Sequence, residues 1–243
     1  MNSVKILLSL AASQNLEVHQ MDVTTAFLIP ELEEDVYMKL PTGYEGACND
    51  GLVWKLNKSI YGLKQASRAW HKEIKSTLIS LNFKQPVSDP CVFVKCQGHF
   101  IFFLALYVDD IVLVTNSTTE LANTKNSLLA KWNMKDLGEI QQFLGLTIER
   151  DRQNRIIHIS QRLLASEILE DARLTDCNAT RSPCDTHIKL YDDSATRSLA
   201  ETEEIKFIDY RHTVGQLLYV SLNPGQTCVQ QSPSSAASST NLA

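Results

Sequence analysis

The chain of 243 residues is 44% hydrophobic and 21% charged, a balance typical of a globular protein with one large or two small domains. This composition excludes a disordered or fibrous protein, and the six cysteines lack the CxxC or Cys/His spacing of a zinc site. The net charge of −5 excludes a surface that is basic throughout, so binding of nucleic acid would depend on a local basic segment.

The same features predict where the protein resides. The cysteines are interpreted as reduced thiols in a reducing compartment. The first residues lack the pattern of a secretory leader, so none is expected, and the longest apolar run is interrupted at its centre by Asp109 and Asp110. We therefore expect a soluble, intracellular protein with no membrane partner.

The first elements in chain order are a helix and a strand. Apolar residues at helical spacing predict an amphipathic helix over 3–13. The next apolar run predicts a strand over 18–23 with Asp22 at its end. Two short strands are predicted over 36–40 and 52–56.

A basic segment follows. From Lys55 to Lys75 there are six basic residues and a single acidic one, Glu73. Residues 70, 74, 78 and 81 are apolar and predict a helix that follows the breaker Gly62. The segment is either a surface that faces a nucleic acid or an ordinary solvated helix face, and charge alone does not separate the two.

Two acids lie between two strands. A hairpin is predicted from 91–95 and 100–107, and a second apolar run follows Tyr107-Val108-Asp109-Asp110. Adjacent carboxylates raise each other's pKa unless a cation lies between them, and Mg²⁺ or Mn²⁺ prefers carboxylate ligands. The alternative is an ordinary polar turn, but the third acid, Asp22, favours the metal site.

The remaining elements are mostly helical. A capping-box pattern from Ser117 to Glu120 opens a predicted helix. Its expected apolar face is Leu121, Leu128, Leu129 and Trp132. A strand is predicted over 156–159 and a helix from the cap Ser160, with its apolar positions at Leu163, Leu164, Ile168 and Ala172. Residues 177–204 are predicted to be loop-like, 210–222 helical and 232–243 disordered.

Four segments in this order resemble the reverse transcriptase of Copia-type retrotransposons. They are Gln20-Met-Asp-Val-Thr-Thr-Ala-Phe-Leu28, Ser59-Ile-Tyr-Gly-Leu-Lys-Gln-Ala-Ser-Arg68, Tyr107-Val-Asp-Asp110 and Asp136-Leu-Gly-Glu-Ile-Gln-Gln-Phe-Leu-Gly145. The resemblance extends over about 4–222. It implies an α+β fold, the right-hand polymerase palm, in which an antiparallel sheet has helices on one face, with partial fingers and the start of the thumb.

The resemblance also implies a division of the chain. Residues 1–176 would form the palm with partial fingers and the start of the thumb. Residues 177–222 would connect toward an RNase H region, and 223–243 would be a disordered tail. After Ser-Leu-Asn the family usually continues with Thr-Arg-Pro-Asp, whereas this chain has Pro224-Gly-Gln-Thr-Cys228, as loss of one base would produce. Residues from Pro224 onward are therefore predicted to be out of frame.

The resemblance assigns the acids to catalysis. Asp22 and Asp109, with the carbonyl of Val23, would bind two Mg²⁺ or Mn²⁺ ions, and Asp110 would be an auxiliary acid. An RNase H-like nuclease also binds two metals with carboxylates. It does not place two acids side by side at a hairpin tip, so Tyr-Val-Asp-Asp favours the polymerase.

Further residues are implied to contact the incoming nucleotide. Phe27 would lie beneath its sugar and favour deoxynucleotides, or is simply part of the core. Lys64 and Arg68, near a helix N-terminus, would contact phosphates, or are ordinary exposed basic residues. The family usually has Asn-Gly where this chain has Ile29-Pro30, so the turn near the site is expected to differ.

Other residues are implied to contact the primer. Tyr107 and Val108 would touch its 3′ end. Leu144 and Gly145, in the segment from Phe143 to Ile148, would belong to the primer grip, with Gly145 allowing close approach of the backbone. The alternative is an ordinary edge hairpin.

The resemblance implies an RNA template, a DNA or RNA primer and deoxynucleoside triphosphates as partners. It also implies the integrase and RNase H segments of a Pol polyprotein, in the virus-like particles of the cytoplasm. In the family a basic fingers region precedes the segment that begins at Val4. We therefore expect this chain alone to be a weak or inactive polymerase. The alternative is a catalytically silent transposon remnant or a non-enzymatic nucleic-acid-binding module.

Overall fold

The structure is a computed structural model that describes residues 2–44, 51–178, 209–222 and 227–230. Contacts divide the chain into two compact units. The first unit consists of residues 1–140, 151–157 and 229–243, and the second of residues 141–150 and 158–228. The loop predicted over 177–204 falls almost wholly outside the described residues. Of the disordered tail predicted over 223–243, the structure describes only Thr227–Gln230, which form a strand. The predicted domain boundaries stay a prediction.

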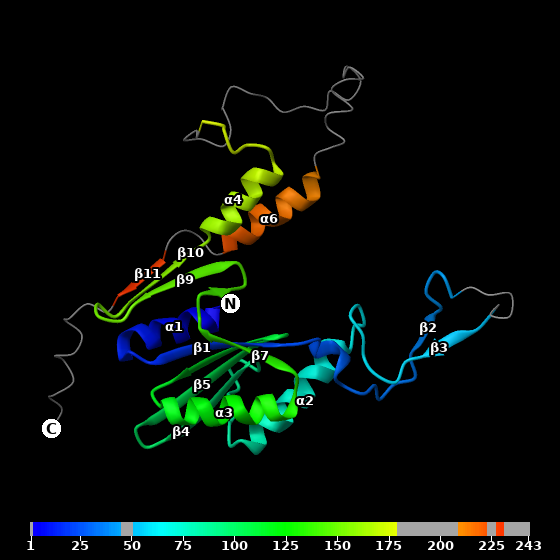
Figure 1. The fold of residues 1–243 in the computed structure, drawn as a ribbon, viewed down its shortest axis with the longest axis horizontal. Helices are drawn as coiled ribbons and strands as arrows, with labels where there is room; N and C mark the ends of the chain where they lie inside the picture. The colour runs from blue at the N-terminus through cyan, green and yellow to red at the C-terminus, as the bar shows by residue number, and fades with distance from the viewer. Residues whose placement is uncertain (1, 45–50, 179–208, 223–226, 231–243) are drawn as a thin grey trace. The chain divides into compact units, whose positions relative to one another are not determined.

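The first unit is built on a five-stranded antiparallel sheet (Figure 1). Its strand order is β4-β5-β6-β1-β7. The strands are β4 (Val92–Gln97), β5 (Phe100–Tyr107), β6 (Asp110–Thr115), β1 (Glu17–Val23) and β7 (Met134–Glu139). The order follows from two hairpins that share β5 and from the pairing of β1 with β6 and β7, which places the strand that carries Asp22 between these two.

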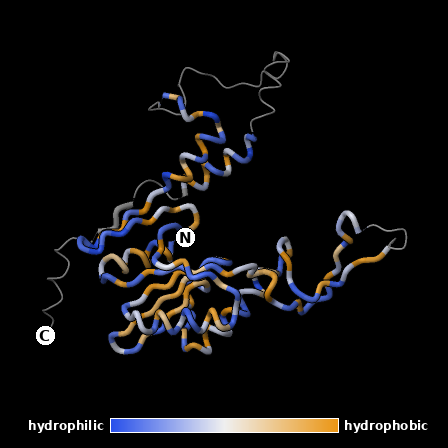
Figure 2. Tube along the Cα trace, viewed as in Figure 1, coloured by the Kyte–Doolittle hydropathy of each residue, from blue (hydrophilic) through white to orange (hydrophobic). Residues whose placement is uncertain are grey.

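Helices cover both faces of this sheet. The helix α1 (Asn2–Gln14) contacts β1, β5 and β6, whereas α2 (Ala66–Ser80) and α3 (Thr118–Lys131) contribute to a core on the opposite face. The prediction of helices on one face was therefore too narrow. Ile111 and Val112 explain why, because these neighbours in β6 point to opposite faces and both are fully buried. Figure 2 shows long hydrophobic stretches along the strands of this sheet.

The core on the face of α2 and α3 is rich in aromatic residues. Trp70 packs edge-on against Trp132, with ring centroids 5.4 Å apart, and Phe83 packs edge-on against Phe102 at 5.2 Å. The residues of this core that come from the strands have the period of two expected for one face of a sheet. They are Met21, Val23, Phe93, Phe102, Leu104, Leu106, Ile111, Leu113 and Met134.

The start of α3 confirms half of the predicted capping box. Ser117 Oγ accepts a hydrogen bond from the backbone N–H of Glu120 at 3.3 Å. The Glu120 carboxylate accepts instead from Lys95 Nζ at 3.0 Å, which ties the helix to β4. Leu129, predicted on the apolar face, is 39% exposed, whereas Leu121, Leu128 and Trp132 are buried.

A small two-stranded sheet precedes α2. Its strands are β2 (Tyr37–Lys39) and β3 (Val53–Lys55), which pair antiparallel within the two predicted ranges. A 3-10 helix, η1 (Ala26–Leu28), joins β1 to this part of the chain. Trp54 and Tyr44 pack edge-on at 5.3 Å between ring centroids.

A second sheet lies mostly in the second unit, with strand order β11-β10-β9-β8. Its strands are β8 (Gln142–Phe143), β9 (Leu146–Asp151), β10 (Ile156–Ser160) and β11 (Thr227–Gln230), and the helices of the unit are α4 (Arg162–Asp171) and α6 (Tyr210–Leu222). The segment from Phe143 to Ile148 is a hairpin of β8 with β9. The strand predicted over 156–159 is β10, which pairs with the other edge of β9.

The start of α4 differs from the prediction. Gln161 rather than Ser160 is the N-cap, and its side chain makes no capping hydrogen bond. Ser160 is the last residue of β10, so its backbone is committed to the sheet. Leu163, predicted on the apolar face, is 53% exposed, whereas Ile168 is buried. None of the helices in the described part of the chain combines the length and apolar character needed to cross a bilayer.

A buried lysine fixes the pairing of β1 with β7. Lys125 Nζ lies 2.7 Å from Asp136 Oδ1 and 2.8 Å from His19 Nδ1, and its side chain is 10% exposed. At this place the register shifts by one residue, so that Leu137 bulges out of β7. Gly138, with a φ of +75°, donates its N–H to the same Asp136 oxygen. Asp136, Leu137 and Gly138 therefore form a bulge, and the Lys125 ammonium of α3 pairs with its aspartate.

Lys125→Met is expected to lower the free energy of unfolding by about 1–3 kcal/mol, because Asp136 would lose its cation in a partly desolvated place. The change is measured by urea unfolding at neutral pH. Lys55→Met is the control, because the Lys55–Asp35 pair is more than half exposed and its loss should cost less than about 1 kcal/mol. Equal effects of the two substitutions would contradict a structural role for the buried cation.

Candidate functional site

The tip between β5 and β6 is held in an unusual conformation. Val108 has a φ of +55°, in the left-handed region that β-branched residues avoid. Its carbonyl oxygen accepts a hydrogen bond from Trp70 Nε1 at 2.7 Å, and Trp70 is buried beneath the tip. The apolar runs on both sides form the strands, and the tryptophan of α2 sets the turn between them. The turn thereby presents Asp109 and Asp110 at the end of the sheet.

The third acid is brought to the same place by strand pairing. Asp22 lies opposite Asp110 in the register of β1 with β6, so both side chains leave the same face of the sheet. The Val23 N–H donates to the Asp109 carbonyl at 2.9 Å, which joins the end of β1 to the tip. Gln20, two residues before Asp22, donates from Nε2 to Asp110 Oδ1 at 3.0 Å.

The surroundings of Asp109 and Asp110 disfavour the charged form of each carboxylate. Burial, together with the charge of Asp22, raises the pKa of Asp109, although a hydrogen bond from Tyr61 opposes the shift. Burial likewise raises the pKa of Asp110, with further repulsion from Asp22 and Asp109, against a hydrogen bond from Gln20. Asp109 Oδ1 is buried and has no hydrogen-bond partner. Each of these costs would be relieved by a cation.

The donor chemistry fits a hard divalent ion. Carboxylate oxygens are the ligands that Mg²⁺ and Mn²⁺ prefer, and the unpartnered Asp109 oxygen supplies one. Among the residues that the structure describes, however, no group of three or more His, Cys, Asp or Glu side chains is gathered closely enough to hold a metal ion. Strand pairing brings the three acids to one end of the sheet. In this structure their side chains are not close enough together to bind one ion jointly.

Phe27 is linked to Asp109 through the side chain of Tyr61. Its half-buried ring packs against the core of the first unit, as the core interpretation predicted. The ring also contacts the ring of Tyr61, with centroids 5.0 Å apart. The Tyr61 hydroxyl donates to Asp109 Oδ2 at 3.1 Å. Phe27 and Asp109 are thus joined by one tyrosine.

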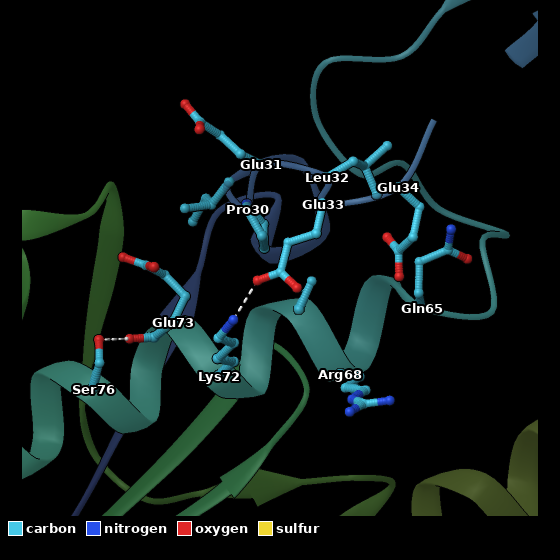
Figure 3. A pocket seen from close by; sticks show the side chains of 12 residues that line it. Pro30, Glu31, Leu32, Glu33, Glu34, Gln65, Arg68, Lys72, Glu73 and Ser76 are labelled. Carbon is cyan, nitrogen blue, oxygen red and sulfur yellow. Dashed lines mark hydrogen bonds and ion pairs between the residues drawn. The ribbon is translucent and has the colours of Figure 1, made fainter. Parts of the chain in front are cut away.

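The two basic residues predicted to bind phosphate lie at the start of α2. Both side chains are exposed, and Arg68 lines a cavity of about 850 Å³ between α2 and residues 29–34 (Figure 3). Ile29 and Pro30 line the same cavity, so the departure from Asn-Gly lies in its wall. Lys72 pairs with Glu33 across it, and Lys72 and Arg68 lower the pKa of Glu33.

The residues predicted to contact the primer divide between the units. Tyr107 is 50% exposed and Val108 38% exposed, so both side chains are accessible at the tip of the first unit. Leu144 and Gly145 belong to the second unit and form the two-residue turn between β8 and β9, with φ of +50° and +73°. Tyr219 OH donates to the Leu144 carbonyl at 2.6 Å, which fixes this turn to α6.

Sequence reasoning missed three residues that contact the acids or their turn. Gln20 was detectable, because residues two apart on a strand share a face. Tyr61 lies within the segment from Ser59 to Arg68, but no local pattern connects it to Asp109. Trp70 was predicted as core, and nothing in a helical spacing indicates that its N–H reaches a distant turn.

The raised pKa of Asp110 predicts how stability depends on pH in metal-free buffer. The folded state binds the Asp110 proton more tightly than the unfolded state, so stability should fall as pH rises from about 4 through the folded pKa. Asp110→Asn keeps an acceptor for Gln20 and removes this dependence. The free energy of unfolding of the variant minus that of the parent should therefore increase over this window in urea titrations. A difference that is constant with pH would contradict it.

Comparison with known proteins gives consistent matches along the chain. The family model of the reverse transcriptase (RNA-dependent DNA polymerase) matches residues 1–186. The chain is 40% identical over 221 residues to the "Retrovirus-related Pol polyprotein from transposon TNT 1-94" of Nicotiana tabacum, covering 90% of this chain and 17% of the relative. It is 36% identical over 219 residues to the Pol polyprotein from transposon RE1 of Arabidopsis thaliana, again covering 90% of this chain and 14% of the relative.

A yeast relative matches a shorter part. The Transposon Ty1-BL Gag-Pol polyprotein of Saccharomyces cerevisiae is 33% identical over 153 residues, which is 60% of this chain and 8% of the relative. The chain thus spans less than a fifth of the length of each of these three polyproteins.

Proposed function

We propose that this chain, which belongs to the reverse transcriptase (RNA-dependent DNA polymerase) family, supplies the polymerase active site of a Copia-type retrotransposon Pol polyprotein. The reaction is transfer of a nucleotide from a deoxynucleoside triphosphate to the 3′-hydroxyl of a primer on an RNA template. The observation that carries the proposal is the register of β1 and β6, which puts Asp22 opposite Asp110 beside the Asp109 turn.

Each acid has a separate role in this proposal. Asp22 and Asp109 bind divalent ions, with the Val23 carbonyl as a further oxygen, and Asp110 adds negative charge beside them. Two Mg²⁺ or Mn²⁺ ions, when bound, supply activation of the primer hydroxyl and neutralisation of charge on the transferring phosphoryl group. The unpartnered Asp109 oxygen and the raised pKa values of Asp109 and Asp110 support a cation at this place.

The proposal assigns the five-stranded sheet to the palm of a right-hand polymerase. Tyr107 and Val108, exposed at the tip, contact the end of the primer. Leu144 and Gly145, in the two-residue turn between β8 and β9, form the primer grip. Lys64 and Arg68 contact phosphate groups from the start of α2. The other segments of the polyprotein act as partners of this one.

The test is primer extension with purified protein on an RNA template, in Mg²⁺ and separately in Mn²⁺. Weak incorporation that requires a divalent ion, deoxynucleotides and the RNA template is the expected result. Binding of primer-template without incorporation under either metal would instead identify a nucleic-acid-binding module. Protein that neither extends nor binds a primer-template would overturn the proposal.

Phe27→Ala is expected to weaken discrimination against ribonucleotides by roughly ten- to a hundredfold, because Phe27 presents the ring that would collide with a 2′-hydroxyl. The measurement is the ratio of kcat/KM for a deoxynucleotide to that for the matching ribonucleotide. Leu28→Ala, the neighbour whose side chain is 40% exposed, is the control and should leave the ratio unchanged. An unchanged ratio in Phe27→Ala would leave Phe27 with its core role alone.

A further inference from the structure

The side chain of Tyr61 contacts both an acid of the site and Phe27. Its hydroxyl donates to Asp109 Oδ2 at 3.1 Å. Its ring contacts the Phe27 ring at 5.0 Å between centroids, with the planes 57° apart. The two groups of one residue therefore touch the two residues to which we assign metal binding and sugar recognition.

The backbone around Tyr61 is held in place. Ser59 is fully buried, its hydroxyl donates to the Phe27 carbonyl, and its N–H donates to the Pro30 carbonyl at 3.0 Å. Gly62 has a φ of +94°, which lets the chain turn directly after the tyrosine. The N–H of Leu63 closes this turn on the Ile60 carbonyl at 3.3 Å. Tyr61 thus extends from an anchored turn.

The hydrogen bond also determines which Asp109 oxygen remains available. A phenol has one proton to donate, and it is directed at Oδ2. The other oxygen, Oδ1, is buried without a partner. A carboxylate held by one oxygen has its rotation restricted, so the free oxygen keeps one direction. Such preorganisation strengthens metal binding because less freedom is lost when the ion binds.

We propose that Tyr61 is a positioning residue with two separable roles. Its hydroxyl holds the Asp109 carboxylate through Oδ2 and so leaves Oδ1 as the oxygen that would bind the divalent ion. Its ring supports Phe27 and thereby maintains discrimination between deoxynucleotides and ribonucleotides. The inference rests on the proposed function, and two substitutions separate its parts. Tyr61→Phe removes the hydroxyl and keeps the ring, whereas Tyr61→Ala removes both.

The first experiment measures binding of Mn²⁺ alone by titration calorimetry, without nucleotide or primer. Tyr61→Phe is expected to raise the Kd for Mn²⁺ about tenfold, the equivalent of one modest hydrogen bond. Asp109→Asn should bind more weakly still. Tyr210→Phe, in which the hydroxyl of a 74% exposed tyrosine of α6 is removed, is the control and should match the parent. Thermal unfolding in chelator confirms that each variant is folded.

The second experiment measures discrimination by primer extension. Tyr61→Phe should keep the parental ratio of deoxynucleotide to ribonucleotide kcat/KM, while its activity requires more metal. Tyr61→Ala should lower that ratio by about tenfold, in the direction of Phe27→Ala. A tyrosine with only a structural role would change the unfolding midpoint without moving either the Kd or the ratio.

The outcomes separate this inference from the proposed function. A parent protein that binds Mn²⁺, with Tyr61→Phe binding it equally or more tightly, overturns the positioning role and leaves the proposed function intact. A parent that binds no Mn²⁺ and extends no primer overturns both. A parent that binds Mn²⁺ and extends no primer overturns the polymerase alone, because the calorimetric comparison still decides the role of the hydroxyl.

Discussion

Asp109→Asn is expected to reduce primer extension by at least about a hundredfold while leaving the protein folded. The carboxylate supplies a buried oxygen without a hydrogen-bond partner, and an amide is a much poorer ligand for a divalent ion. The measurement is single-nucleotide incorporation at saturating Mg²⁺ on an RNA template. Added Mn²⁺ should restore little activity, because the missing ligand is the same for both ions.

The control for this substitution is Asp35→Asn. Asp35 pairs with Lys55 at 2.6 Å, and its side chain is 68% exposed, so loss of its charge should leave incorporation within about twofold of the parent. In metal-free buffer at neutral pH, Asp109→Asn should be at least as stable as the parent, because a carboxylate with a raised pKa is removed. If Asp109→Asn keeps the activity of the parent, Asp109 has no role in catalysis.

Trp70→Ala is expected to lower the free energy of unfolding by about 3–5 kcal/mol. Trp70 is 1% exposed, packs against Trp132 in the core, and donates to the Val108 carbonyl. The substitution removes a large buried ring and leaves the strained tip without its donor. The change is measured by urea unfolding. The residual folded protein should also extend primers poorly, because Val108 precedes Asp109.

Two further variants separate the loss of packing at Trp70 from the loss of its hydrogen bond. Trp54→Ala removes a tryptophan that is 40% exposed and should cost about 1 kcal/mol or less. Trp70→Phe keeps most of the packing and loses the N–H, so it should cost about 1–2 kcal/mol. Trp70→Phe should also lower incorporation more than its stability loss accounts for. If Trp70→Phe keeps full activity, the hydrogen bond to Val108 does not position the acids.

Hydrophobic periodicity alone located most elements of the first unit. The helix at the N-terminus was predicted over 3–13 and occurs over 2–14, because four apolar residues at helical spacing have only one way to be buried together. The strand that carries Asp22 and the hairpin that carries Asp109 were found for the same reason. Alternating or continuous apolar runs leave an extended chain few other ways to hide its side chains.

Periodicity was a less reliable guide to where a helix begins and to which helices pack on each face of the sheet, because both depend on residues distant in the chain. Ser160 has the chemistry of a helix cap, but its backbone is paired in β10, so the cap passed to Gln161. Helices were expected on one face of the sheet. Burial of both Ile111 and Val112 requires cover on both, and which helix supplies it depends on the order of the strands.

The sequence by itself indicated the family and predicted the three acids, because four motifs in one order carry more information than any single contact. Only the tertiary structure decided which partners those acids have. Tyr61, Gln20 and Trp70 reach the acids and their turn across 48, 90 and 38 positions of the chain. Contacts over such separations depend on strand order and on the packing of α2. Local spacing records neither, and the partners of the carboxylates could therefore be identified only once the chain was folded.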